Sequence, residues 1–331
     1  VTLGAIGGFY ATHFRGASPT LFSMDLMAYG LAMLVIGGMW SYPDPGRLIS
    51  DSVGSLEAKT FLTAMGGNMP QASVSDCCQR IAAGEMDVAV VVGGEAVYSK
   101  NKLKKTGRDL NKTGTELKPA ERFGENVSMS SQHERDKGFV VPTQVYALFE
   151  STIRADRNET HDQHRQRISN LWAGLNRVAV QNPYAWVRTP MSAEEIMHEN
   201  PDNRMVGYPY TKAMNANSFV DFGGAIIICS VGKAKALGIN PDQWVFPHAA
   251  TDGNASYFFS ERQNFHQSPA IRLTGNRCLE LAEISIDEVG PMDLYSCFPS
   301  VVQITMNELG VSPAREVTTT GGLSFFGGPM N

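Results

Sequence analysis

The stretch that decides the fold is Gly321-Gly322-Leu323-Ser324-Phe325-Phe326-Gly327-Gly328-Pro329, near the end of the 331-residue sequence. A glycine pair stands at each end of a short apolar run, and the pattern predicts a loop. The middle position of the closing Gly-Gly-Pro triplet is Gly328. Because glycine has no group that takes or gives a proton, this position supplies neither an acid nor a base.

Upstream of this loop, the chain alternates segments typical of strands and helices. Residues 86–92 (Met-Asp-Val-Ala-Val-Val-Val) are almost continuously apolar, which is typical of a strand in a parallel sheet covered on both faces. Asn68 and Pro70 form a helix-start pattern before it. Helices are predicted over 68–84, 142–155, 160–180, 231–237, 269–282 and 301–309, and strands over 34–39, 86–92, 223–229, 244–250 and 289–296. Residues 100–137 lack apolar periodicity and predict an exposed excursion.

Composition excludes several classes of function. The net charge is −5, and no Lys/Arg cluster is interleaved with aromatics, so nucleic-acid binding is not expected. The apolar run in 27–40 is short and broken by glycines, so no membrane span is expected. Five scattered cysteines lack metal-ligand spacing, which predicts no metal site and favours a reducing, cytoplasmic location.

Four segments of the chain resemble the thiolase superfamily. Residues 68–96 are similar to its nucleophile helix and following strand, and 215–225 are similar to its Asn-Ser-x-x-x-Asp-Gly-Ala element. Residues 293–299 (Asp-Leu-Tyr-Ser-Cys-Phe-Pro) resemble the loop that reads His-Asp-Cys-Phe in sterol carrier protein-type thiolases. Residues 321–329 resemble the loop that ends in Gly-His-Pro. The pattern fits best a thiolase-like subgroup labelled acetyl-CoA acetyltransferase-like.

The resemblance implies an α/β fold of the thiolase type. Two similar α/β halves would pack as a five-layer αβαβα sandwich, with a long loop and helix insertion in the first half. The expected domains are residues 1–99 with 215–240 as the N-terminal half, 100–214 as the insertion, and 241–331 as a C-terminal half that we expect to continue past Asn331. The resemblance also implies a homodimer, with an edge strand near 62–65 as the contact.

Three positions depart from the family pattern. The family's nucleophilic cysteine stands at the start of a buried helix, where the helix dipole and free N–H groups lower its pKa. The matching position here is Gly67. The histidine base is replaced by Gly328, and the oxyanion-hole asparagine or histidine by Tyr295. Cys77 and Cys78 lie further along the helix and are interpreted as core cysteines. The resemblance therefore implies a degenerate active site.

Tyr295 and Cys297 are the remaining catalytic candidates. The resemblance gives Cys297 the position of an acid/base cysteine in sterol carrier-type enzymes, and loop packing is the other interpretation. The phenol of Tyr295 is suited to donate to a developing oxyanion, or to accept a proton if its pKa is lowered. Capping of a strand end is its structural alternative.

The expected pocket lies where the two halves meet. Besides the Tyr295 and Cys297 loop, we expect it to be lined by Asn68 with Gly67 at a helix start, and by Gly327 and Gly328, because helix starts and strand ends leave a crevice with free N–H groups. Glycines in place of side chains predict a wider crevice, with room for an acyl group bulkier than acetyl.

Other polar candidates carry weaker motifs. His248 follows a predicted strand and is a candidate to face the site, and Lys212 is a candidate for a coenzyme A phosphate, with a surface position as the alternative for each. His161 and His164 lie on a polar helix segment and are interpreted as a solvated face.

Three functions are consistent with these residues. The first is an acyl-CoA-handling enzyme of the acyltransferase type, acting in fatty-acyl or sterol CoA-ester metabolism without cysteine-dependent thiolysis; retro-aldol cleavage of a CoA ester by Tyr295 is its alternative chemistry. The second is a non-catalytic acyl-CoA or lipid carrier, and the third a scaffold with a vestigial pocket. In each of the first two, a coenzyme A thioester is the substrate or ligand, and no cofactor is tightly bound.

Overall fold

The computed structural model describes residues 31–36, 42–108, 116–118, 120–125 and 127–328. They fall into two compact units. The sheet unit contains the described residues up to 125 together with Phe219–Pro247. The helical unit contains Val127–Ser218 and His248–Gly328. The predicted division into two halves and an insertion, and the stacking in five layers, stay predictions.

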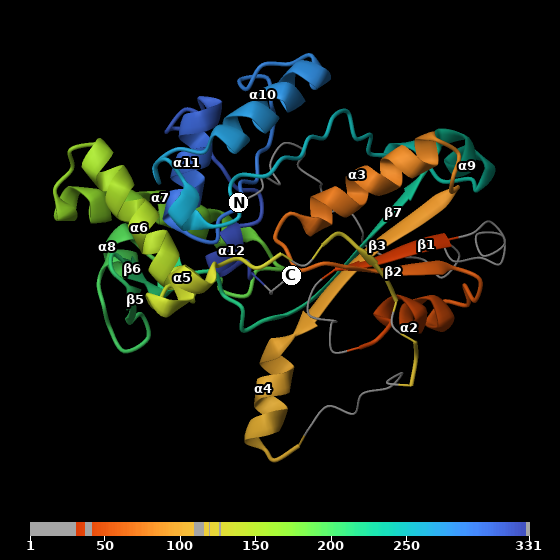
Figure 1. Cartoon of the computed structure of the whole chain (residues 1–331), viewed down its shortest axis with the longest axis horizontal. Helices are drawn as coiled ribbons and strands as arrows, with labels where there is room; N and C mark the ends of the chain where they lie inside the picture. The colour runs from red at the N-terminus through yellow and green to blue at the C-terminus, as the bar shows by residue number, and fades with distance from the viewer. Residues whose placement is uncertain (1–30, 37–41, 109–115, 119, 126, 329–331) are drawn as a thin grey trace. The chain divides into compact units, whose positions relative to one another are not determined.

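The sheet unit is built on a five-stranded sheet with the order β4-β2-β1-β3-β7 (Figure 1). Its strands are β1 (Leu31–Ile36), β2 (Lys59–Thr63), β3 (Val88–Ala96), β4 (Glu121–Phe123) and β7 (Asp221–Cys229). The first four run parallel, and β7 pairs antiparallel with β3. The predicted strand over 86–92 is confirmed as β3, and the one over 223–229 as β7, which lies at an edge of the sheet and is only half buried.

Helices cover both faces of this sheet. The helix α3 (Met69–Ala82) packs on the face that carries Ala89 and Val91. On the opposite face, Val88, Val90 and Val92 are buried with residues of α2 (Pro45–Ser52) and the end of α9 (Val231–Ala236). Alternate β3 residues therefore supply two separate cores, as expected for a doubly covered sheet.

The strand predicted as the dimer contact is not an edge. β2 lies between β1 and β4, with hydrogen-bonded neighbours on both sides. The prediction of pairing through residues near 62–65 is therefore wrong, because an edge-to-edge contact needs unpaired N–H and C=O groups.

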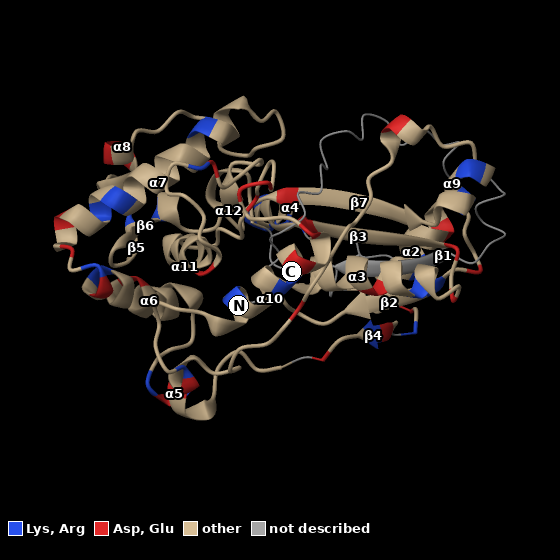
Figure 2. Cartoon of the chain, turned by 90° about the horizontal axis from the view of Figure 1, so that it is seen from above, with Lys and Arg blue, Asp and Glu red and all other residues tan. Residues whose placement is uncertain are grey.

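The excursion over 100–137 contains more regular structure than expected. The helix α4 (Val97–Lys105) buries no side chain, and α5 (Gln132–Asp136) begins with a capping box between Ser131 and Glu134. Figure 2 shows acidic and basic residues scattered over the described elements rather than gathered in one block.

Long helices dominate the helical unit, and the sequence predicted them well. They are α6 (Pro142–Asp156), α7 (His161–Gln181), α10 (Pro269–Ala282) and α11 (Pro299–Leu309). The shorter elements are α8 (Ala193–Met197), β5 (Met205–Gly207), β6 (Tyr210–Thr211), η4 (Lys212–Met214), η6 (Phe259–Glu261) and α12 (Gly322–Phe325). In the sheet unit, η5 covers Pro241–Gln243.

The core of the helical unit follows the apolar face of α7. Ile168, Trp172 and Leu175 are at most 2% exposed and pack with residues of α6 and α11. A capping box between Thr160 and Gln163 begins the helix. The capping box and the 3.6-residue spacing of the apolar residues therefore both predict this helix.

Two predicted strands are absent from the described chain. Residues 244–250 and 289–296 form no strand. Leu294 N–H donates to the carbonyl of Val317 at 2.9 Å, but no ladder continues from that bond. A strand exists only with a hydrogen-bonded neighbour, and an apolar run alone does not supply one. Among the residues that the structure describes, no helix is long and apolar enough to cross a membrane.

Candidate functional site

Three of the four motif segments meet in the helical unit. Ala216 N–H donates to the carbonyl of Cys297 at 3.2 Å, and Asn217 N–H donates to that of Leu323 at 3.0 Å. The chain then closes on itself, because Gly328 N–H donates to the carbonyl of Asn217 at 2.8 Å. These bonds fix the loop before α11 and the glycine-rich stretch against the segment that precedes β7.

The glycine pair Gly321-Gly322 is required by close packing on α7. A Cβ on Gly321 would lie 2.4 Å from Cβ of Ala179, and one on Gly322 would lie 2.5 Å from Cδ2 of Leu175. Both glycines also have positive φ, +108° and +73°. The expected loop is in fact broken by the one-turn helix α12, and Trp172 Nε1 donates to Ser324 Oγ at 2.9 Å to hold it.

The second glycine pair does not leave an open space at its last position. Gly327 has φ +128°, a conformation that favours glycine. A Cβ on Gly328 would approach Cβ of Leu323 to 3.1 Å and Cβ of Ala216 to 3.2 Å. The prediction that Gly328 widens a crevice is therefore wrong at this position, because the side chains of Leu323 and Ala216 already occupy the space beside it.

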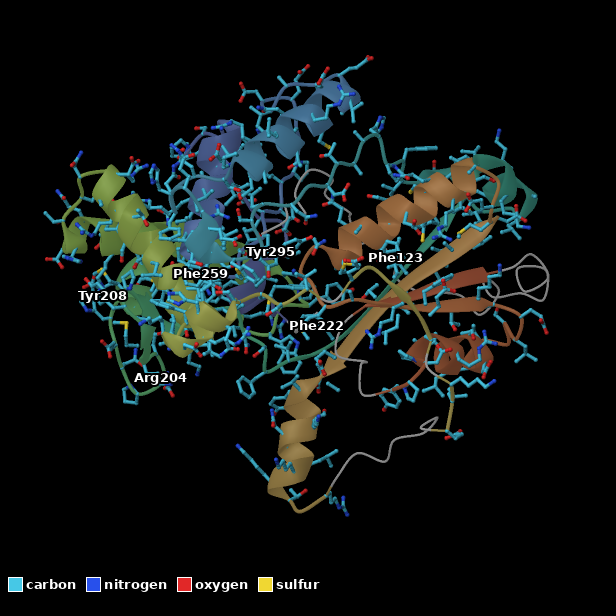
Figure 3. The ribbon with its side chains drawn as sticks, in the orientation of Figure 1. Phe123, Arg204, Tyr208, Phe222, Phe259 and Tyr295 are labelled. Carbon is cyan, nitrogen blue, oxygen red and sulfur yellow. The ribbon has the colours of Figure 1, made fainter. Side chains whose placement is uncertain are left out.

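Tyr295 and Cys297 are brought together with a third residue, Tyr146 of α6. The phenols of both tyrosines lie close enough to the Cys297 thiol to influence its pKa. Cys297 is only 7% exposed, and Tyr295 is half-buried. Figure 3 labels Tyr295 in the loop before α11 and shows Tyr208 well separated from it, on the hairpin of β5 and β6. Tyr146 was not among the predicted site residues.

Burial governs the ionisation of this cluster. It raises the pKa of Cys297 to about 12, although hydrogen bonds from Tyr146 and Tyr295 oppose the rise. Burial, followed by the charge and hydrogen bond of Cys297, also raises the pKa of Tyr295 above its usual value. All three groups are therefore protonated at neutral pH. The upward shift in the pKa of Tyr295 favours a role as proton donor over the alternative of a proton acceptor.

An aromatic cluster fixes the loop that carries Cys297. The ring of Tyr146 stacks on Phe298 with centroids 4.5 Å apart and planes 17° apart. The ring of Tyr210 lies on the same Phe298 at 5.2 Å. Ser296 Oγ accepts from Leu323 N–H at 3.0 Å. The residues on either side of Cys297 are thus held by α6, β6 and α12.

A buried ionic network lies beneath this cluster. Glu150 of α6 is fully buried, and its carboxylate accepts hydrogen bonds from His164, Gln303 and Tyr210, each at 2.7 Å. The Tyr210 hydroxyl oxygen also lies 3.1 Å from Ser300 Oγ. The prediction that His164 lies on a solvated face is wrong, because its side chain is 1% exposed. Its neighbour His161 is exposed, as predicted.

The remaining candidates belong to other segments of the chain. Lys212 is exposed, and its Nζ donates to the carbonyl of Asp202 at 3.3 Å. His248 is exposed on a segment that forms no strand. Gly67 and Asn68 lie at the start of α3 in the sheet unit. Their meeting with the Tyr295 loop stays a prediction.

The sequence predicted Asn68 as the start of the α3 helix, and Cys77 and Cys78 as core residues of that helix. Asn68 stands at the N-cap as predicted, but its side chain makes no capping hydrogen bond. Cys77 is fully buried in the core against β3, and Cys78 is half-buried. Burial, followed by the charge of Asp76, raises the pKa of Cys77 to about 12, which is typical of an inert core thiol. Among the described residues, no group of His, Cys, Asp and Glu side chains is arranged to hold a metal ion.

Comparison with solved structures identifies the fold. A monomeric SCP2-thiolase-like protein type 1 from Mycobacterium smegmatis is 28% identical and superimposes with a TM-score of 0.77, over 95% of this chain and 60% of that one. The chain has a thiolase-like fold. It spans less than two thirds of the length of that relative. The fold and superfamily expected from the four motif segments are confirmed.

Two further comparisons place this thiolase-like chain among known proteins. A protein of Mycolicibacterium smegmatis named probable acetyl-CoA acetyltransferase is 23% identical over 326 residues, which cover 89% of this chain and 80% of the relative. The Ltp2–ChsH2(DUF35) aldolase has the same fold, with 17% identity and a TM-score of 0.63 over 90% of this chain and 75% of that one. No protein-family model matches the chain.

Proposed function

We propose that this thiolase-like protein handles acyl-CoA esters through the Tyr295 loop and does not perform cysteine-dependent thiolysis. The observation that carries the proposal is the position of Tyr295 and Cys297 on one loop, whose Cys297 carbonyl is hydrogen-bonded to the segment that also holds Gly328. Protonated donors converge there, whereas the positions of the usual nucleophile and base are Gly67 and Gly328. Convergent polar groups favour an enzyme over a carrier or a scaffold.

The role assigned to Tyr295 is stabilisation of developing negative charge. Acyl transfer and retro-aldol cleavage of a CoA ester both place negative charge on the thioester oxygen in the transition state. A half-buried, protonated phenol is suited to donate to that oxygen, and such donors contribute most where water is excluded.

Retro-aldol cleavage is the second candidate. It is favoured by the protonated phenol in the absence of a cysteine at position 67, and by the fold shared with an aldolase, which is an analogy of fold alone. The ligand class in either case is a CoA ester of a fatty acyl or sterol side chain. Within the helical unit, Gly327 is a proposed substrate-binding residue, and Lys212 and His248 are proposed to bind the outer part of the ligand.

The experiment is incubation of the purified protein with a panel of acyl-CoA esters, from acetyl-CoA to fatty-acyl and 3-hydroxyacyl side-chain esters. Mass spectrometry then measures turnover, retained ligand and covalent acylation. We expect turnover of a bulky ester and no acetyl group on any of the five cysteines. Retention without turnover would favour the carrier, and an acetyl-thioester on Cys77 or another cysteine would disprove the proposal.

A further inference from the structure

Asp293 shares one face of the chain with Tyr295. Met292, Leu294 and Ser296 are buried, at most 4% exposed. Asp293 and Tyr295 alternate with them and are half-buried. Alternating burial is the pattern of an extended segment with one face against a core, in which side chains two residues apart project from the same face with their Cα atoms about 6.6 Å apart. A carboxylate therefore stands beside the phenol on the less buried face.

Two threonines hold the carboxylate of Asp293. Thr318 Oγ1 donates to Asp293 Oδ1 at 3.2 Å, and Thr319 Oγ1 donates to Oδ2 at 3.0 Å. Thr318 is 1% exposed, and its Oγ1 accepts from the backbone N–H of Gly321 at 3.0 Å. The carboxylate is thereby fixed to the segment that leads into the glycine-rich stretch.

The backbone on either side of Tyr295 is fixed to the same stretch. Leu294 N–H donates to the carbonyl of Val317 at 2.9 Å, and Ser296 Oγ accepts from Leu323 N–H at 3.0 Å. All of these residues belong to the helical unit. The directions of the phenol and of the neighbouring carboxylate are therefore set by hydrogen bonds within one unit.

Asp293 keeps acceptor capacity for a ligand. A carboxylate has about four lone-pair sites, and the two threonine hydroxyls use two of them. Among the described residues, no Lys, Arg or His forms an ion pair with Asp293. A half-buried carboxylate that is oriented by hydrogen bonds but not neutralised by a cation is suited to accept a proton from a bound hydroxyl.

We propose that Asp293 is the general base of a retro-aldol cleavage in which Tyr295 is the oxyanion donor. This role rests on the proposed function, because it needs a CoA ester bound beside Tyr295, and it selects retro-aldol cleavage as the chemistry. The substrate class is then a 3-hydroxyacyl-CoA ester. Its hydroxyl oxygen is on carbon 3 and its thioester oxygen on carbon 1, so an acceptor and a donor on one face address both.

The reaction breaks one O–H bond and one carbon–carbon bond. The proton of the 3-hydroxyl passes to the Asp293 carboxylate, and a C=O double bond forms at carbon 3. The bond between carbons 2 and 3 breaks, and its electron pair moves onto the thioester oxygen, to which the Tyr295 hydroxyl donates. The enolate then takes the proton back from Asp293 at carbon 2. The products are a carbonyl compound and a shorter acyl-CoA ester, and no oxidant or reductant is needed.

The first test measures binding and needs no turnover. Equilibrium dialysis compares racemic 3-hydroxyoctanoyl-CoA with octanoyl-CoA. We expect the natural protein to bind the hydroxy ester about ten-fold more tightly, because its hydroxyl donates to a charged acceptor. Asp293→Ala should abolish this preference and Asp293→Asn should reduce it, whereas Asp287→Asn, at an exposed carboxylate, should keep it. Equal affinities of the natural protein for the two esters overturn the role of Asp293.

The second test measures rates with the ester that the panel identifies. We expect Asp293→Asn, which keeps the shape of the side chain and one acceptor oxygen for the threonines, to lower kcat by about 100-fold or more with KM changed by a few fold. Formate should restore part of the rate of Asp293→Ala, because a small carboxylate can replace the missing one, and none of the rate of Tyr295→Phe. A residue that only held the loop would not respond to formate. Circular dichroism checks that each variant is folded.

The outcomes separate this role from the proposed function. If no CoA ester is bound or turned over, the proposed function fails and the role of Asp293 fails with it. If esters without a 3-hydroxyl are turned over and hydroxy esters are not cleaved, the proposed function stands and the role of Asp293 is overturned. Cleavage at the natural rate by Asp293→Asn, or retention of a hydroxy ester without cleavage, also overturns it.

Discussion

His164 Nε2 lies 2.7 Å from Glu150 Oε1, and neither residue is more than 1% exposed. The other ring nitrogen of His164 lies 2.7 Å from Glu159 Oε2. One imidazole therefore joins a buried carboxylate on α6 to one near the surface. Burying charges is costly unless each has a partner, so this line of contacts stabilises the fold only while it is complete.

Removal of His164 should be strongly destabilising. We expect His164→Ala to lower the free energy of unfolding by about 3–5 kcal/mol, because Glu150 would remain as a buried carboxylate without its partner. The exposed His161, on the same helix, gives the control His161→Ala, for which we expect a change within about 0.5 kcal/mol. Urea unfolding measures both. A loss below about 1 kcal/mol for His164→Ala would contradict this view of the network.

Low pH should weaken the same network at Glu159, its carboxylate near the surface. Burial alone would raise the pKa of Glu159, but hydrogen bonds from Arg167 and His164 outweigh it and lower the pKa to about 2. The ionised form is thus favoured in the folded state. Its contribution is present above the unfolded pKa of about 4.5 and is lost as the pH falls toward 2.

The measurement is the free energy of unfolding from pH 6 to pH 2.5, for the natural protein and for Glu159→Gln. We expect the variant to show a shallower decline, by an amount on the order of 1 kcal/mol, the size of a partly solvated ion pair. Identical slopes for the two proteins would show that Glu159 does not titrate in this way. The exposed Glu194 supplies a control, Glu194→Gln.

Gly321 should tolerate no side chain. We expect Gly321→Ala to cost about 3 kcal/mol or more, because its Cβ would overlap Ala179 and its φ of +108° is strained for alanine. Gly290 has open space around a Cβ and serves as the control. Thermal unfolding of Gly321→Ala and Gly290→Ala measures the difference. Equal melting temperatures would mean that α12 is not packed on α7 in this way.

Tyr295→Phe should separate catalysis from binding. We expect kcat for the ester found in the panel to fall about 100-fold, with KM changed by no more than a few fold, because the phenol acts mainly in the transition state. The matched variant Tyr257→Phe alters an exposed tyrosine and should behave like the natural protein. A natural rate in Tyr295→Phe would return this residue to a structural role.

Much of the helical framework was readable from the sequence. The amphipathic patterns predicted α6, α7 and α10 to within one or two residues. His164 was missed because Arg165 and Arg167 flank it, although it stands four residues before Ile168 and so shares the buried face of α7. That spacing was the available signal. The strands predicted over 244–250 and 289–296 failed for another reason, since a strand depends on a neighbour that local sequence does not reveal.

Only part of the candidate site could be predicted from the sequence. The motif containing Tyr295 and Cys297 singled out that loop, and in the structure Cys297 contributes to the raised pKa of Tyr295. Tyr146 carried no signal, because nothing in the pattern of α6 relates one of its residues to a loop so far along the chain. The ionisation of Tyr295 also depends on burial, which is a property of the folded state rather than of a motif.

The close fit around Gly328 has a consequence for variants at this position. Any larger side chain there would need Leu323 and Ala216 to yield by a few tenths of an ångström before it found a place. The cost of a substitution at Gly328 therefore depends on how far two apolar neighbours can move.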